Sequence, residues 1–336
     1  MLVTLTGAYR NAGDHLIGAR ARALLTQYAD KDIVNVDRRH IKDAHYDLFN
    51  EASAVILCGG PAYQKEMYPK VYNIDLSRIS SRVIPMGLGW KGSLGTTPET
   101  FEFAPDAKKF ITEIHSRIEL SSTRDLVSEQ VIRHTGVSNI SMTGCPAWYD
   151  LTAINRSYEF VATPSRIVYS MPAKPQANVL ETLSLLAKAF PKAEKVLALH
   201  HGWKPADSKH GERMFKWHLK VASLARLRGW RTQGIADGLA KFEELYTWAD
   251  LHIGYRVHAH IYSISQRSAS ILINEDSRGV GQVTTLGGPM LMASSSASEI
   301  MDAVQAHFKT GGEAVAGSVA VMQATFPKME AFLATI

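Results

Sequence analysis

The segment 254–260, Gly-Tyr-Arg-Val-His-Ala-His, carries the residue types best suited to catalysis in this chain. It follows an apolar run at 251–253 that predicts a strand, and apolar spacing predicts a helix at about 258–266. Free N–H groups at a helix N-terminus bind phosphate or carboxylate. Arg256 adds a guanidinium for the same anion, and His258 can give or take a proton near neutral pH. The segment therefore predicts an anion site with an acid–base group.

Three histidines, His252, His258 and His260, raise the alternative of a zinc site. Residues two apart on a helix point to different faces, so His258 and His260 would not share one ion there. No Cys or acidic partner stands at a familiar ligand spacing. We therefore expect no metal. Ordinary roles for Arg256 and His258, surface charge and helix capping, stay open.

Two glycine-rich segments also follow predicted strands. Residues 87–92, Gly-Leu-Gly-Trp-Lys-Gly, match the dinucleotide fingerprint letter by letter, but no helix start follows them, which favours a cleft loop over an NAD site. Residues 58–61, Cys-Gly-Gly-Pro, follow the predicted strand 54–57, and paired glycines let backbone approach a ligand closely. Cys58 has no accompanying base, so we do not expect a thiol nucleophile.

The segment 121–125, Ser-Ser-Thr-Arg-Asp, follows an apolar run at 118–120 that predicts a strand, and a helix is predicted at about 125–134. In this position Arg124 could reach a ligand and Asp125 could cap the helix. An Arg–Asp pair on the surface explains the same two residues equally well, so both interpretations stay open.

Short apolar runs alternate with helical patterns along all 336 residues, which is typical of α/β proteins with parallel sheets. The length suits two doubly wound, Rossmann-like domains facing across a cleft, at 1–155 and 160–312. The stretch 151–164 is the expected linker, and the apolar helix predicted at about 313–336 could pack back on the first domain. Ligands of such sheets bind beyond the carboxyl ends of the strands, where the segments above lie.

Charge and composition narrow the function. A net charge of +5 favours anionic partners. The basic residues are scattered and no aromatic-studded RNA-binding signature occurs, so we expect no nucleic acid. Two cysteines do not suggest a disulfide framework, and neither a signal peptide nor a membrane-spanning apolar run is evident. The expected location is cytoplasmic.

Six short motifs, in this order over residues 5 to 290, resemble the polysaccharide pyruvyl transferase family: Asn11-Ala12-Gly13-Asp14, Cys58-Gly59-Gly60-Pro61, Gly87-Leu88-Gly89, Thr123-Arg124-Asp125 with Ser128, Gly144-Cys145-Pro146, and Arg256-Val257-His258. Two positions depart from the family pattern. His15 stands where the family often has Glu, and the segment 274–278 offers Arg278 where the family often has Lys.

The resemblance implies a GT-B-like fold, phosphoenolpyruvate as co-substrate without any other cofactor, and a pyruvate ketal on a polysaccharide sugar or its lipid-linked precursor as product. The residues expected to carry this are His258 and Arg256 for catalysis, Arg124, Arg256 and Arg278 for the donor, and Asn11, Asp14, Gly59 and Gly60 for the acceptor. A lipid-linked acceptor would bring the enzyme to the inner face of the membrane, where peripheral contact is expected.

Two other functions use the same residues. A GT-B glycosyltransferase would hold the diphosphate of a nucleotide-activated sugar with the same Arg and His, since fold does not fix function. A non-catalytic glycan- or anion-binding protein would use the same cations to bind its ligand without catalysing a reaction. Stabilisation by phosphoenolpyruvate rather than by nucleotide sugars would distinguish pyruvyl transfer from glycosyl transfer.

Overall fold

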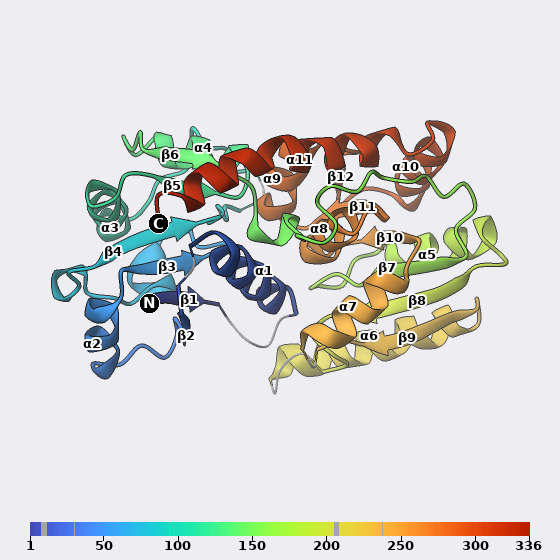
Figure 1. Ribbon diagram of the computed structural model, residues 1–336. Helices are drawn as coiled ribbons and strands as arrows, with labels where there is room; N and C mark the ends of the chain where they lie inside the picture. The colour runs from blue at the N-terminus through green and yellow to red at the C-terminus, as the bar shows by residue number, and fades with distance from the viewer. Residues whose placement is uncertain (8–11, 30, 94, 205–207, 237) are drawn as a thin grey trace.

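The computed structural model describes residues 1–336 except 8–11, 30, 94, 205–207 and 237, and it contains two parallel β-sheets lying side by side with helices around each (Figure 1). The predicted α/β class is confirmed. We call the part built on the first sheet the N-terminal half and the part built on the second the C-terminal half.

The first sheet has the order β2-β1-β3-β4, and all its neighbours pair in parallel. Its strands are β1 (Leu2–Thr6), β2 (Ile33–Asp37), β3 (Ala54–Cys58) and β4 (Arg82–Met86). Two short parallel strands follow, β5 (Ser121–Thr123) and β6 (Ile140–Met142), and Leu88 forms a bridge to Thr123. The helices of this half are α1 (Ala12–Ala29), α2 (Ala44–Glu51), α3 (Pro105–Ser116) and α4 (Leu126–Arg133).

The strand predicted at 118–120 is wrong by three residues, because β5 is formed by Ser121–Thr123. Ile118 and Leu120 are only partly buried and pack at the edge of the core. All three polar strand residues are fully buried, and the two serine hydroxyls have partners: Ser121 Oγ lies 2.8 Å from Nε2 of His115, and Ser122 Oγ accepts from the amide of Gly87 at 2.9 Å and bonds the hydroxyl of Thr143. A polar strand of this kind escapes a search for apolar runs.

The second sheet has the order β12-β11-β10-β7-β8-β9, again all parallel. Its strands are β7 (Arg166–Ser170), β8 (Glu194–Leu199), β9 (Trp230–Gly234), β10 (Leu251–Gly254), β11 (Ala269–Asn274) and β12 (Leu291–Met292). The helices of this half are α5 (Val179–Ala189), α6 (Lys209–Arg226), α7 (Leu239–Trp248), α8 (Val257–Ser265), α9 (Ser277–Leu286) and α10 (Ala297–Lys309).

The last helix, α11 (Glu313–Leu333), runs from the C-terminal half back to the N-terminal half (Figure 1). Arg82 at the start of β4 donates to the carbonyl oxygens of Thr335 and Ile336 at 2.8 and 2.7 Å. The hydroxyl of Tyr28 in α1 donates to Glu330 at 2.9 Å. These hydrogen bonds attach α11 and the residues after it to β4 and α1 of the N-terminal half.

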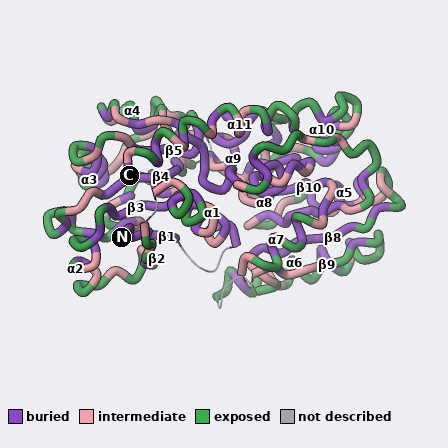
Figure 2. The backbone as a smooth tube through the Cα atoms, in the orientation of Figure 1, coloured by how far each residue is buried: buried purple, intermediate pink, exposed green. Residues whose placement is uncertain are grey.

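Buried residues run along the strands of both sheets and through α8, which packs against the N-terminal half (Figure 2). One apolar cluster includes Leu16 of α1, Ala259 of α8 and Phe332 of α11, so the two halves share part of a core. Within the described residues, no helix combines the length and the apolar character needed to cross a membrane.

Candidate active site

Four neighbouring strands of the second sheet, β11, β10, β7 and β8, end at the edge that bears two of the predicted donor residues, Arg256 and Arg278. The segments that follow them are 275–278, 255–258, 171–174 and 200–203. Because the strands are parallel and adjacent, these four segments, far apart in the sequence, meet at one edge.

Arg256 is the N-cap residue of α8 and is half-buried. Its Nε donates to the carbonyl oxygen of Met171 at 2.9 Å, and its Nη2 lies 3.3 Å from Nδ1 of His201. The side chain borders a cavity of about 340 Å³ that is also lined by Lys174, His201, His210 and His218. Arg256 thus turns a guanidinium toward a cavity surrounded by groups that can be cationic.

His258, in the first turn of α8, faces the N-terminal half. A Cβ on Gly13 of α1 would lie 1.9 Å from Nδ1 of His258, so the imidazole packs directly on the glycine backbone. Only a residue without a side chain permits this approach. His258 is half-buried in this position, which places its ring between the two halves of the molecule.

Burial, followed by the charges of Arg278, Arg124 and Arg256, lowers the pKa of His258 to about 3. The ring is therefore neutral near pH 7 in the free protein, and three guanidinium groups act on it at once. The segment after β8 shows the same effect: burial and the charge of Arg256 lower the pKa of His201 to about 4. A positive potential of this kind favours an anionic ligand.

Arg278 opens α9 and forms a bidentate ion pair with Asp276, with Nη2 to Oδ2 at 2.7 Å and Nε to Oδ1 at 2.9 Å. Asp276 is also the N-cap of α9 and accepts from the amide of Arg278. Although burial opposes the charged form, Asp276 holds the pKa of Arg278 above its usual value, with smaller electrostatic contributions from Glu275 and from Asp14 of α1. Arg278 is therefore within electrostatic range of a predicted acceptor residue of the other half.

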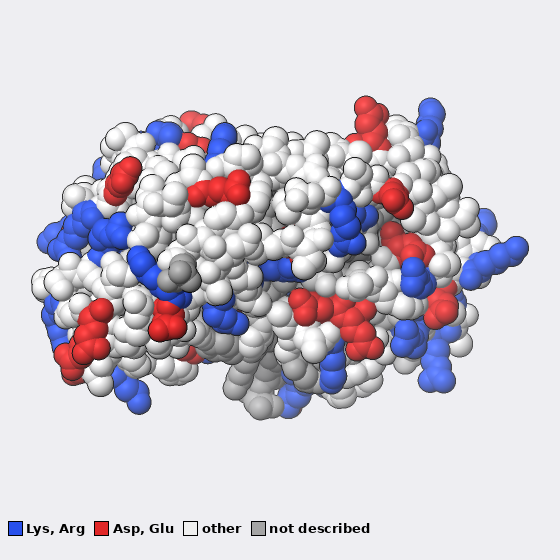
Figure 3. Space-filling view, viewed as in Figure 1, with Lys and Arg blue, Asp and Glu red and all other residues white. Residues whose placement is uncertain are grey.

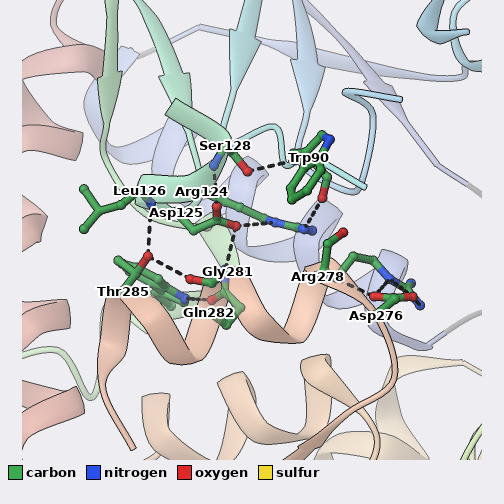
Figure 4. A network of polar contacts seen from close by, with 12 residues as sticks. Trp90, Arg124, Asp125, Leu126, Ser128, Asp276, Arg278, Gly281, Gln282 and Thr285 are labelled. Carbon is green, nitrogen blue, oxygen red and sulfur yellow. Dashed lines mark hydrogen bonds and ion pairs between the residues drawn. The ribbon is translucent and has the colours of Figure 1, made fainter. Parts of the chain in front are cut away.

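Arg124 is buried, only 3% exposed, so the structure excludes an Arg–Asp pair on the surface. Its Nε donates to Asp125 at 3.0 Å and its Nη2 to the carbonyl oxygen of Trp90 at 3.1 Å. Asp125 caps α4 by accepting from the amide of Ser128 at 2.7 Å and also accepts from Gln282 of α9 (Figure 4). Arg124 acts on His258 by charge while being held within the contact between the halves.

The glycine segments of the N-terminal half are shaped by close packing. Gly59 and Gly60 have φ of +52° and +77°, and a Cβ on Gly59 would lie 2.3 Å from the side chain of Ile17. The backbone of this turn can therefore run against α1 only with glycine. Asp14 lies in the first turn of α1, while Asn11, also predicted for the acceptor, lies outside the described residues.

Arg38 is a candidate that the sequence analysis missed. It directly follows β2 and reaches across the end of β1, where its Nη2 would lie 3.2 Å from a Cβ on Gly7 and its Nη1 3.9 Å from one on Gly60. Its guanidinium lies 5.2 Å from the ring centre of Tyr72. The apolar run at 33–36 marks Arg38 as a residue that follows a strand, but the neighbours of its guanidinium are known only from the strand order.

The two adjacent histidines after β8, His200 and His201, lie in different surroundings. His200 is buried and its Nε2 bonds the hydroxyl of Tyr246 at 2.6 Å, while His201 is half-buried beside Arg256. Burial raises the pKa of the Cys58 thiol to about 12, which opposes a nucleophilic role at neutral pH. No cluster of His, Cys, Asp or Glu suited to a metal ion occurs among the described residues.

Solved structures share this architecture over the whole chain. UDP-GlcNAc 2-epimerase from Neisseria meningitidis bound to UDP-GlcNAc superimposes with a TM-score of 0.59 at 9% identity, covering 99% of both chains. Anabaena Alr3699/HepE in complex with UDP and glucose gives 0.57 at 10% identity, covering 100% of this chain and 99% of the other. The predicted GT-B-like fold is confirmed by these matches.

Sequence comparison leads to one family. No curated protein matches the chain significantly. The sequence model described as polysaccharide pyruvyl transferase matches residues 11–277, which include all six motifs. The chain belongs to the polysaccharide pyruvyl transferase family.

Proposed function

We propose that this protein transfers the pyruvyl group of phosphoenolpyruvate to two hydroxyls of one saccharide, forming a ketal and releasing phosphate. The observation that carries the proposal is the position of His258: its ring touches Gly13 of the other half, and burial together with three guanidinium groups lowers its pKa. An acid–base group surrounded by cations between two halves suits a small dianionic donor that meets its acceptor there.

The donor carries a phosphate and a carboxylate, and each needs a cation. Arg256 and Arg278 of the C-terminal half are placed to supply them, and the buried Arg124 of the N-terminal half adds positive charge from behind. Arginine suits both groups because its planar fork binds carboxylate and phosphate through two N–H groups. When the donor's negative charge offsets these cations, the pKa of His258 rises from its low value and the ring can carry a proton.

His258 then donates that proton to C3 of phosphoenolpyruvate, converting the enol carbon C2 into an electrophile. One saccharide hydroxyl attacks C2, the C2–O bond to phosphate breaks, and a second hydroxyl closes the ketal. Two hydroxyl protons are released; one restores His258 and the other leaves with phosphate. His258 is the catalytic acid of this scheme, with Arg256 stabilising the charge of the leaving phosphate.

We assign the acceptor side of the site to Asp14, Gly59 and Gly60 and, from the sequence motif alone, to Asn11, and we add Arg38. The Asp14 carboxylate can accept a hydrogen bond from a sugar hydroxyl. The guanidinium of Arg38, over the glycine turn, can donate to ring oxygens or to an anionic substituent. A polysaccharide precursor linked to a lipid would reach this side at the inner face of the membrane.

Two measurements test the proposal. Phosphoenolpyruvate should raise the melting temperature of the purified protein, and phosphate should be released when a saccharide acceptor is added. Replacement Arg256→Gln should abolish the stabilisation. The proposal fails if phosphoenolpyruvate neither stabilises the protein nor loses phosphate with any member of a broad glycan panel.

A second function, glycosyl transfer from a nucleotide-activated sugar, is favoured by the cavity of about 340 Å³ beside Arg256, because the similar HepE and epimerase structures hold UDP or UDP-GlcNAc. Lys174, His201 and His210 would surround a diphosphate there. If UDP stabilises the protein and phosphoenolpyruvate does not, this second function replaces the first.

A further inference from the structure

The positive charge of the protein is concentrated on one helix and the turn after it. Residues 209–231, which comprise α6 and the start of β9, contain seven Lys or Arg and a single carboxylate, Glu212. Their net charge is +6, whereas the whole chain carries +5. The rest of the molecule is therefore nearly neutral, and the net positive charge of the protein comes from this segment.

Five of these cations lie on the surface. Lys209, Arg213, Lys216, Lys220 and Arg226 are all exposed. Within the described part of the chain, none of them forms an ion pair with a carboxylate. In Figure 3, Lys and Arg side chains project from the lower right edge, where α6 and β9 lie in Figure 1. The helix thus presents a continuous basic face to solvent.

Large apolar side chains lie among the cations. Leu227, just after α6, is 82% exposed and Leu219 is 43% exposed. Trp203 is 36% exposed and, with Leu219 and Trp230, borders a surface groove of about 610 Å³ between α6 and β9. Exposed apolar side chains surrounded by basic residues indicate an interaction surface rather than an ordinary solvent-exposed face.

We propose that this surface, formed by α6, Trp203 and Leu227, docks onto the anionic headgroups of a membrane. The Lys and Arg side chains attract anionic lipid, and Leu219, Leu227 and Trp203 enter the interface between headgroups and acyl chains. An RNA partner would explain the basic residues but not the exposed leucines, because it offers Leu219 and Leu227 no apolar environment. The combination of both features selects the lipid surface.

The placement of α6 links docking to the active site. Its buried side bears Met214 and His218, which line the cavity beside Arg256 together with His210. The exposed side of the same helix bears the lipid-facing residues. Docking would therefore hold this cavity within one helix diameter, about 10 Å, of the headgroups.

Sedimentation of the full-length protein with vesicles tests the proposal. Vesicles of phosphatidylcholine containing about 30 mol% phosphatidylglycerol should bind it, and vesicles of phosphatidylcholine alone should not. The double variant K216E/K220E should bind at least about tenfold more weakly, because each basic residue contributes about fivefold near such a surface. The matched control K108E/K109E, with the same charge change on exposed α3 positions, should bind like the unmodified protein.

Leu227→Ser separates the two contributions, since it keeps the charge and should still weaken binding several-fold. The proposal is overturned if K216E/K220E and K108E/K109E lose affinity equally, which would indicate a general charge effect. The proposal is also overturned if single-stranded RNA binds the unmodified protein more tightly than K216E/K220E while anionic vesicles bind neither. Phosphate release with a water-soluble acceptor should be unchanged in K216E/K220E, so failure here leaves the proposed reaction intact.

Discussion

At the scale of single residues, the free protein keeps His258 without the proton that the proposed reaction requires. Burial and three arginines favour the neutral ring, so the proton must arrive with the donor. This arrangement restricts protonation of C3 to the complex, because the acid forms only when a dianion has neutralised the cations around it.

Proton uptake on donor binding is the first prediction. Because binding raises the pKa of His258 from about 3, protons are bound between that value and the higher pKa of the complex. Affinity for phosphoenolpyruvate should therefore rise as pH falls from about 8 toward about 6, where the phosphate itself begins to protonate. Titration calorimetry in buffers of different ionisation enthalpy should show proton uptake that His258→Gln abolishes. Equal uptake in both proteins would contradict this assignment.

The contact between Gly13 and His258 gives a second prediction. In Gly13→Ala the new methyl would lie 1.9 Å from Nδ1, so the imidazole must move. Displacement of an acid by about 1 Å costs on the order of a hundredfold in rate, so kcat/KM should fall tenfold to a hundredfold. The control Gly317→Ala makes the same change within α11, where the structure leaves open space, and should keep full activity. Wild-type activity in Gly13→Ala would show that the ring has no fixed role.

At the scale of elements, the sequence identified most segments that follow strands but not which of them meet. The strand at 251–253 was predictable from an apolar run, and so was the turn bearing Arg256. Arg38 was not predicted because its contacts come from the ends of β1 and β3, and the strand order that joins them depends on pairing between distant segments. Long-range pairing leaves no local signal in a single sequence.

Arg124 illustrates the same limit. The sequence allowed a ligand contact or a surface pair, and the structure buries it against Asp125 and Trp90. Arg124 is buried because Gly89 and α9 both approach it. A Cβ on Gly89 would lie 1.9 Å from the guanidinium Nε. Neither approach can be inferred from the local motif.

This packing gives a third prediction, for Asp125→Ala. The change removes the cap of α4 and leaves the buried Arg124 without its carboxylate. Loss of one partner of a buried ion pair costs about 3–5 kcal/mol, so the free energy of unfolding in urea should fall by about that amount. Asp75→Ala, which removes an exposed cap, should lower the free energy of unfolding far less. Similar costs for the two variants would mean that the Arg124 pair contributes little.

At the scale of the whole molecule, α11 couples the two halves. Its buried face joins the apolar cluster that also contains residues of α1 and α8. The site lies between these elements, because Gly13 belongs to α1 and His258 to α8. The relative position of the halves, and with it the distance between donor and acceptor groups, should therefore depend on this helix.

Phe332→Ala is the fourth prediction. The side chain is fully buried, and its removal leaves a cavity that costs about 3–5 kcal/mol. We expect a lower melting temperature by calorimetry and a broader transition, because the halves lose part of their shared core. Lys328→Ala, exposed on the same helix, should change the free energy of unfolding by less than about 0.5 kcal/mol. An unchanged melting temperature in Phe332→Ala would show that α11 does not couple the halves.

The most direct test of the central claim follows the proton that reaches C3. In D₂O with phosphoenolpyruvate and an acceptor, the wild-type protein should release phosphate and form a ketal whose methyl group carries one deuterium. His258→Gln should lower that rate by about a hundredfold to ten-thousandfold while phosphoenolpyruvate still raises its melting temperature, and the surface control His134→Gln should match wild type. Undiminished deuterium transfer by His258→Gln would contradict the account.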